Sequence, residues 1–261
     1  MANGSGAARL SRYPLLELLH PREQTRAVVL LLALGLTGWG ALVWAARMPV
    51  WGATSILVGL LLVPGVRKWR ADLRREGLTV MVLSVILTMQ GFHSLEHLAQ
   101  WIQYHIFHWQ PQRSSGLISA ANAEWVHFVW NWGVVFVVAL LMFRGIRSPW
   151  AWALLAWTLA HSAEHTYMMV RYLQVKQELG LLGEPSVSAQ GLPGILGRDG
   201  WLATSMLTGD SWCGRLPGLT TTMRLDVHFW WNTGETLLLA AAGHAYLRRR
   251  AATFSQRQDW M

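Results

Sequence analysis

Apolar runs of membrane-spanning length dominate the sequence and exclude an ordinary soluble fold. Several of them reach the ~20 residues that a helix, rising ~1.5 Å per residue, needs to cross a hydrocarbon layer of ~30 Å. Of the 261 residues, 52% are hydrophobic and only 14% are charged, which is too little polar material for a soluble domain of this length. The sequence therefore predicts an all-α, polytopic membrane protein with six transmembrane helices. We place these spans at residues 27–46, 50–66, 78–109, 121–143, 149–175 and 226–247.

Positive charges gather in alternate connections between the predicted spans. Arg and Lys are frequent before the first span, after the second, after the fourth and after the sixth, whereas the other short connections carry a single Arg. Because cytoplasmic loops keep Arg and Lys, this pattern predicts a multi-pass protein of a bacterial-type inner (plasma) membrane with both termini in the cytoplasm. The topology also explains the net charge of +8, so we expect no nucleic-acid partner.

Two short motifs each occur twice, and in the same order. His-Ser-X-Glu-His occupies residues 93–97 and 161–165, and His-Phe-X-Trp-Asn follows at 127–131 and 228–232. Matched motifs in matched order predict a duplicated helix pair, and thus a four-helix core. The chain then divides into an N-terminal interfacial segment with a helix hairpin (1–76), a first repeat (77–147), a second repeat (148–250) with an outward loop (176–225), and a cytoplasmic tail (251–261).

The repeated motifs carry side chains that suit a metal ion. Residues at positions i, i+3 and i+4 share one helix face, so each His-Ser-X-Glu-His motif points two imidazoles and one carboxylate the same way. Ionisable groups at membrane depth must face the protein interior and find partners there. The single cysteine, Cys213, excludes a cysteine-based site. The predicted metal ligands are His93, Glu96, His97, His127, His161, Glu164, His165 and His228.

Two further carboxylates share faces with predicted ligands. Glu124 lies three residues before His127, and Glu235 lies seven residues after His228, so the two occupy different positions in the repeats. The sequence leaves open whether either joins the site. It identifies no catalytic residue.

Imidazole and carboxylate together suit iron, zinc, copper or manganese rather than calcium or magnesium. The donor set resembles that of the carboxylate di-iron bundles and of the His-rich membrane desaturases and hydroxylases in ligand chemistry alone, because the usual histidine spacings of the latter are missing. We therefore expect a transition-metal site, with two Fe as the first choice and Cu or Zn as alternatives. The leading hypothesis is a dinuclear iron or copper oxidoreductase that acts on an apolar or lipid-soluble small molecule. Membrane lipid and a redox partner or another subunit would be its partners.

Two other functions fit parts of the pattern. A b-haem electron-transfer membrane subunit would use histidine pairs as axial ligands, but it gives Glu96 and Glu164 no role. A divalent-metal transporter or sensor would use the polar helix faces as a pathway. The transporter hypothesis has less support, because a pathway needs polar side chains along its whole length. The cytoplasmic halves of the third and fifth spans, residues 78–89 and 150–157, carry little polar material.

Overall fold

A computed structural model describes residues 13–258 of the chain. The described residues form helices and connecting turns without a β-strand, so the all-α prediction is confirmed for them. The long helices are α2 (Thr25–Trp44), α3 (Val50–Glu76), α4 (Leu78–His105), α5 (Glu124–Phe143), α6 (Pro149–Leu181) and α8 (Arg224–Gln258). The short ones are α1 (Pro14–Leu19), η1 (Arg22–Gln24), η2 (Ser119–Asn122), α7 (Trp201–Thr204) and η3 (Trp212–Arg215).

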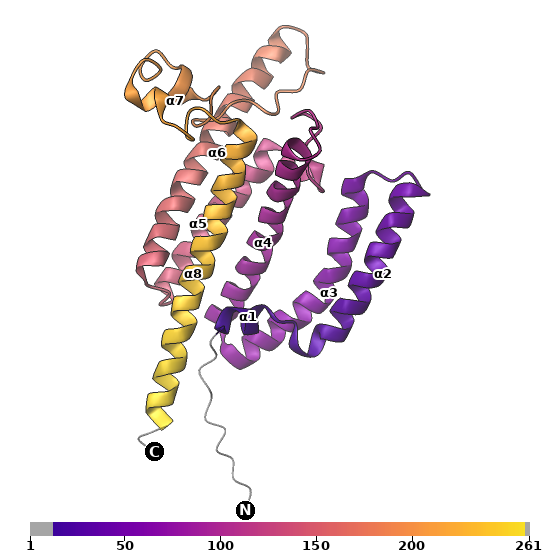
Figure 1. Cartoon of the computed structure of the whole chain (residues 1–261), viewed down its shortest axis with the longest axis vertical. Coiled ribbons are helices and arrows are strands. Elements are labelled where there is room, and N and C mark those ends of the chain that lie inside the picture. The colour runs from indigo at the N-terminus through magenta and orange to yellow at the C-terminus, as the bar shows by residue number, and fades with distance from the viewer. Residues whose placement is uncertain (1–12, 259–261) are drawn as a thin grey trace, which may run out of the picture.

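Four of the long helices form a bundle. Helix α5 packs against α6, α6 against α8, α8 against α4, and α4 against α5, which closes the ring. Helices α2 and α3 make a hairpin that lies beside this bundle, and α3 joins it through α4 (Figure 1). The small helix α1 packs on α8 and α4 at one end of the bundle, whereas α7 and the long connections lie at the other end. We name these the α1 end and the loop end.

Local sequence signals explain where the helices begin and end. Ser148 caps α6 by accepting a hydrogen bond from the Ala151 amide at 3.2 Å, and Pro149 fits the first helical position because its missing N–H needs no partner there. Gly77, with φ of +87°, separates α3 from α4. The predicted third span runs four residues too far, because α4 ends at His105. Helices α3, α6 and α8 continue well beyond their predicted spans.

Four helical segments are long and apolar enough to cross a membrane. They are Arg22–Trp44, Val50–Glu76, Leu78–His105 and Glu124–Phe143. This makes a multi-pass membrane protein the natural assignment. Helices α6 and α8, with 33 and 35 residues, have the length but are more polar, since their buried faces carry His, Glu, Thr and Asn and their ends carry charges.

The interior of the bundle changes character along its length. From the α1 end to the middle, close-packed apolar side chains fill it, among them Leu83, Val138, Leu154 and Leu239. Toward the loop end the buried side chains are mostly polar. This band includes Gln90, His97, Glu124, His127, Asn131, Thr158, His161, Glu164, His165, His228, Asn232 and Glu235. The fold thus places ionisable groups on one level of the bundle, above an apolar base.

Candidate metal centre

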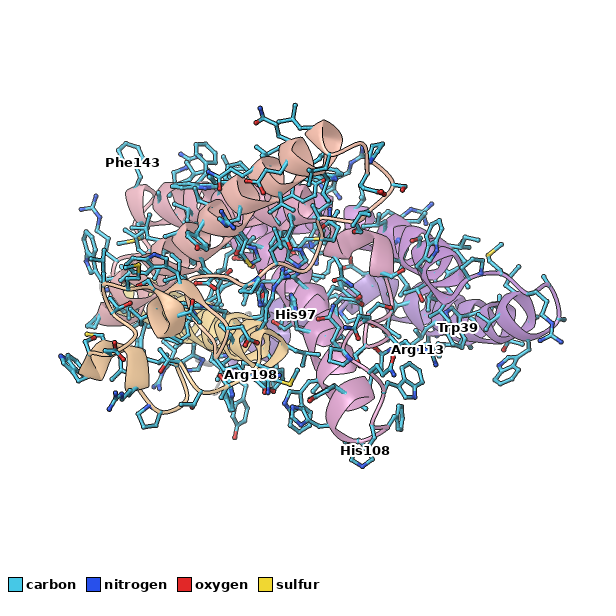
Figure 2. The ribbon with its side chains drawn as sticks, turned by 90° about the horizontal axis from the view of Figure 1, so that it is seen from above. Trp39, His97, His108, Arg113, Phe143 and Arg198 are labelled. Atoms are coloured by element: carbon cyan, nitrogen blue, oxygen red, sulfur yellow. The ribbon has the colours of Figure 1, made fainter. Side chains whose placement is uncertain are left out.

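Six imidazoles from four helices meet in the polar band. Figure 2 shows His97 among the bundle helices, seen from the loop end. Neighbouring ring centroids in the cluster lie 4.8 to 6.3 Å apart. His127 on α5 and His228 on α8 are central, because each contacts both His97 on α4 and His165 on α6. The members of this imidazole cluster are His93, His97, His127, His161, His165 and His228.

Several imidazole rings are held by a hydrogen bond at one nitrogen, while the other nitrogen has no partner among the described residues. The Nδ1 atoms of His97, His161 and His228 lie 3.1 Å from Gln100 Oε1, 2.9 Å from Glu235 Oε2 and 2.9 Å from the Arg224 carbonyl oxygen. A proton on Nδ1 donates to each of these oxygens, which leaves an unprotonated Nε2 with its lone pair available. Ligating histidines are oriented by this kind of contact.

The free nitrogens are buried without a partner among the described residues. The Nε2 atoms of His93, His97, His161 and His228 have none, and neither ring nitrogen of His165 has one. Burying so many unsatisfied polar atoms side by side costs free energy, about 1–3 kcal/mol for each group. A cation that accepts several lone pairs would remove this cost. Three of the rings, His93, His97 and His127, already have ligand atoms within 4.8 Å of one another.

Corresponding residues of the two motif pairs make corresponding contacts around the cluster. The Nδ2 atoms of Asn131 and Asn232 donate to the backbone carbonyls of His127 and His228, at 2.9 and 3.0 Å. The Trp130 ring lies 5.4 Å from the His93 ring, and the Trp231 ring stacks on His161 at 5.3 Å. The asparagines thus fix the helix turn that carries each histidine, and the indoles wall the cluster.

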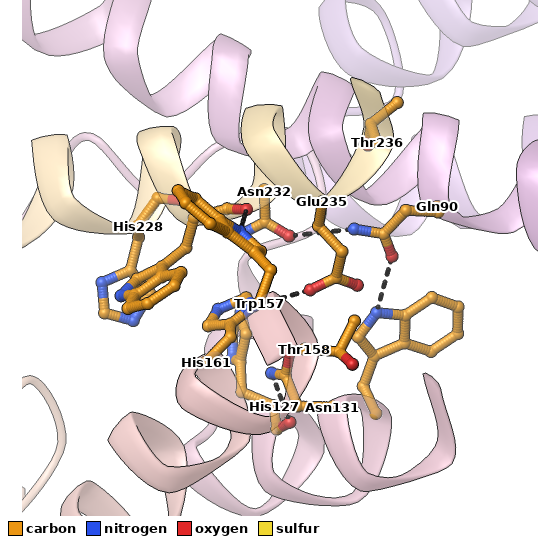
Figure 3. A network of polar contacts seen from close by, with 12 residues as sticks. Gln90, His127, Asn131, Trp157, Thr158, His161, His228, Asn232, Glu235 and Thr236 are labelled. Carbon is orange, nitrogen blue, oxygen red and sulfur yellow. Dashed lines mark hydrogen bonds and ion pairs between the residues drawn. The ribbon is translucent and has the colours of Figure 1, made fainter. Parts of the chain in front are cut away.

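Glu235, whose role the sequence left open, lies against the cluster. Its Oε2 accepts the His161 hydrogen bond shown in Figure 3, while its Oε1 is buried and has no partner within residues 13–258. Gln90 extends the polar band by donating to Asn232 Oδ1 at 3.3 Å and accepting from Trp130 Nε1 at 3.2 Å. Glu235 therefore orients an imidazole, and its free oxygen is one more candidate donor atom.

The two glutamates of the repeated motifs are engaged differently from what the sequence led us to expect. Glu96 accepts hydrogen bonds from the backbone amides of Leu117 and Ile118 at 2.9 and 2.8 Å. Glu164 accepts one from the amide of Leu196, at 3.2 and 3.3 Å from its two oxygens. Both carboxylates thus tie a connection at the loop end to a bundle helix and act as loop anchors, while their role as metal ligands stays a prediction.

A sequence signal for these anchors exists and was missed. Gly116-Leu117-Ile118 and Gly194-Ile195-Leu196 both lie between the His-Ser-X-Glu-His and His-Phe-X-Trp-Asn motifs of their repeat, although at different distances from them. A Cβ atom on Gly116 would lie 2.1 Å from Glu96 Oε1, and one on Gly194 would lie 1.9 Å from Glu164 Oε1. Only glycine allows the carboxylate to come so close to the backbone.

Replacing Gly116 by alanine is therefore expected to destabilise the protein. The new Cβ would displace the Glu96 carboxylate, and φ of +75° at this position is strained for any residue with a side chain. We expect a loss of about 1–3 kcal/mol, seen as a lower melting temperature of the purified protein in detergent. Gly133→Ala is the matched control, because a Cβ on this α5 glycine meets nothing within 4 Å. Equal melting temperatures for the two variants would contradict the anchor.

A part-buried ion pair joins the first turns of α5 and α8 beside the cluster. Arg224 Nη2 donates to Glu124 Oε1 at 2.6 Å, and the Gly191 amide donates to the same oxygen at 3.3 Å. Glu124 Oε2 has no partner among the described residues. The sequence singled out Glu124 but gave no role to Arg224, which could be paired only once α5 and α8 were seen side by side.

Comparisons with known proteins assign no family to the chain. No family model, curated protein or solved structure matches it. Its function is inferred below from the geometry and chemistry of the imidazole cluster.

Proposed function

We propose that this protein holds a transition-metal centre inside the membrane, ligated by the imidazole cluster, and that it acts as a metal-dependent oxidoreductase. One observation carries the proposal: five buried imidazoles and the part-buried His93 form one connected cluster, and most of their Nε2 atoms have no partner among the described residues. Neutral imidazoles with free lone pairs bind cations strongly. The number of rings would supply three ligands to each of two ions.

The donor set bears on which metal is bound. Two ligating carboxylates were the reason to place iron first in the sequence interpretation. With Glu96 and Glu164 anchored to backbone amides, the donors are almost all imidazole nitrogens. Nitrogen sites hold copper most tightly among the divalent first-row metals, so we now favour copper over iron, with zinc as the redox-inactive alternative. A copper or iron ion would supply one-electron chemistry that the side chains themselves lack.

The surrounding membrane architecture is also part of the proposal. We propose that α6 and α8 cross the bilayer with the four apolar helices, giving six spans with both termini in the cytoplasm of a bacterial-type inner membrane. The Arg-rich connections support this orientation. The paired Asn, Trp and Glu contacts in the two halves support an origin of the four-helix core by duplication of a helix pair. The exposed apolar side chains of α2 and α3 suit contact with lipid or with another subunit.

The two alternative functions receive less support from the geometry. Axial imidazoles of a b-haem lie on opposite faces of the macrocycle, but on facing helices the His165 ring lies only 5.1 Å from His127 and 5.0 Å from His228, which leaves no space for the macrocycle between them. A transport path would have to continue toward the α1 end. There Leu83, Val138, Leu154 and Leu239 fill the bundle.

Metal analysis combined with absorption spectroscopy tests the proposal. We expect the purified protein, after removal of metal and reconstitution with Cu²⁺, to bind about two ions per chain without a Soret band. Loaded Cu²⁺ should be reducible by ascorbate and reoxidisable by air, with loss and return of its absorption. Protein that is folded yet binds no copper, iron or zinc above the level of a His-free control peptide would refute the metal centre. Tight binding of zinc alone would refute the redox role but not the site.

A further inference from the structure

A cavity of about 620 Å³ opens at the loop end and reaches the imidazole cluster. Its inner end is formed by His97, His127 and His228, which are all buried. Gln112 and Asp199, which are exposed, line its outer part. The volume lies within the ~300–1,000 Å³ typical of small-molecule sites. The cluster is therefore reached from the water on the loop side.

Many side chains that line this cavity are polar and held by hydrogen bonds, while Pro111, Met223 and Leu225 add apolar surface. Gln100 Nε2 donates to Asn122 Oδ1 at 2.7 Å, and Asn122 Nδ2 donates to the Ser115 carbonyl at the same distance. Gln190 Oε1 accepts from the Glu124 amide at 3.0 Å. The polar part of the wall can hydrogen-bond a hydrated ligand.

One wall residue has an unused acceptor beside the imidazoles. Glu124 is only 2% exposed, and its Oε1 is occupied by Arg224 and by a backbone amide. Its Oε2 is buried and unpartnered. Glu124 lies three residues before His127 on α5, so the two side chains share a face of the helix. A buried carboxylate oxygen without a donor is costly unless a ligand supplies one.

We propose that the cavity is the substrate site of the metal centre, and that its substrate is a small, water-soluble molecule with an O–H or N–H group that donates to Glu124 Oε2. The metal part of this proposal rests on the proposed function; the route through water does not. This water-soluble substrate replaces the lipid-soluble one that we expected from the sequence. Toward the α1 end, the gap between Leu83, Val138 and Leu239 has a volume of only about 10 Å³, too small to admit a substrate.

Thiol labelling tests the water route without any metal. In a Cys213→Ser background, we compare Gln100→Cys and Ser114→Cys, both lining the cavity, with Leu95→Cys, which is 54% exposed on α4, a helix that the proposed architecture places in lipid. The probe is a charged, membrane-impermeant methanethiosulfonate added to proteoliposomes on both sides. Both cavity cysteines should react at least about tenfold faster than the Leu95 variant, because only a hydrated thiol ionises. Ser114→Cys is nearly isosteric and keeps the test valid if Gln100→Cys misfolds; slow labelling of a folded Ser114→Cys overturns the water route.

Ligand binding to the Zn²⁺-loaded protein tests the role of Glu124. In Glu124→Gln the amide oxygen remains the natural acceptor for Arg224, so an NH₂ group replaces Oε2. Acetohydroxamate, which keeps an N–H donor, should bind at least about tenfold more weakly to the variant in a calorimetric titration. Azide, which carries no donor, should change less than about twofold. If Glu124→Gln weakens the binding of both ligands equally, or of neither ligand, the role of Glu124 is overturned. Failure of Zn²⁺ to bind refutes the metal centre instead, and the labelling result still decides whether the cavity is open to water.

Discussion

Replacing His97 and His165 together with alanine is expected to remove most of the bound transition metal. His97 on α4 and His165 on α6 lie on opposite sides of the cluster, and each contacts both His127 and His228. The double variant removes one ligand from each repeat, so it affects the site whether one or two ions bind. We expect metal per chain to fall by about tenfold or more, measured by elemental analysis after dialysis against a weak chelator.

The control for this experiment is an alanine at another helical histidine. His244 lies on α8, outside the imidazole cluster, so His244→Ala should keep wild-type metal content. The double variant should still fold, since removing buried polar rings also removes their desolvation cost. A folded double variant that retains its metal would show that the ions bind elsewhere.

Replacing Glu96 or Glu164 with alanine is expected to lower stability strongly while leaving the metal in place. Each change removes a buried carboxylate that accepts backbone amide hydrogen bonds, at Leu117 and Ile118 in one case and at Leu196 in the other. An amide left without its acceptor costs about 1–3 kcal/mol. The melting temperature in detergent should fall by several degrees, since each kcal/mol shifts it by roughly 2–4 °C in a chain of this size.

Metal content separates an anchor from a ligand. If the two glutamates only tie the loops to the bundle, metal per folded chain stays at the wild-type value in both variants. Glu178→Ala on α6, the same helix as Glu164, is the control for stability because Glu178 is exposed. Loss of metal with an unchanged melting temperature would restore the ligand role that the sequence pattern suggested.

Much of the architecture could be predicted from the sequence because it depends on local properties of the chain. The length of the apolar runs predicts membrane helices, and the structure contains four such candidates. Helical periodicity placed His93 and His97 on one face, as it did His161 and His165. The repeated motifs indicated that helices far apart in the sequence carry equivalent side chains. These inferences need only the geometry of a single helix and the cost of burying polar groups.

The partners of individual side chains depended on the tertiary structure. Glu96 and its imidazole neighbours share a helix face, yet its carboxylate binds the backbone of a loop that approaches only where glycine leaves room. The Glu124–Arg224 pair and the contact of Glu235 with His161 form because α8 packs against its neighbours in one particular register. Helix periodicity determines the direction in which a side chain points. Which atom it contacts depends on how segments far away in the sequence fold around it. A local sequence pattern does not encode the position of those segments.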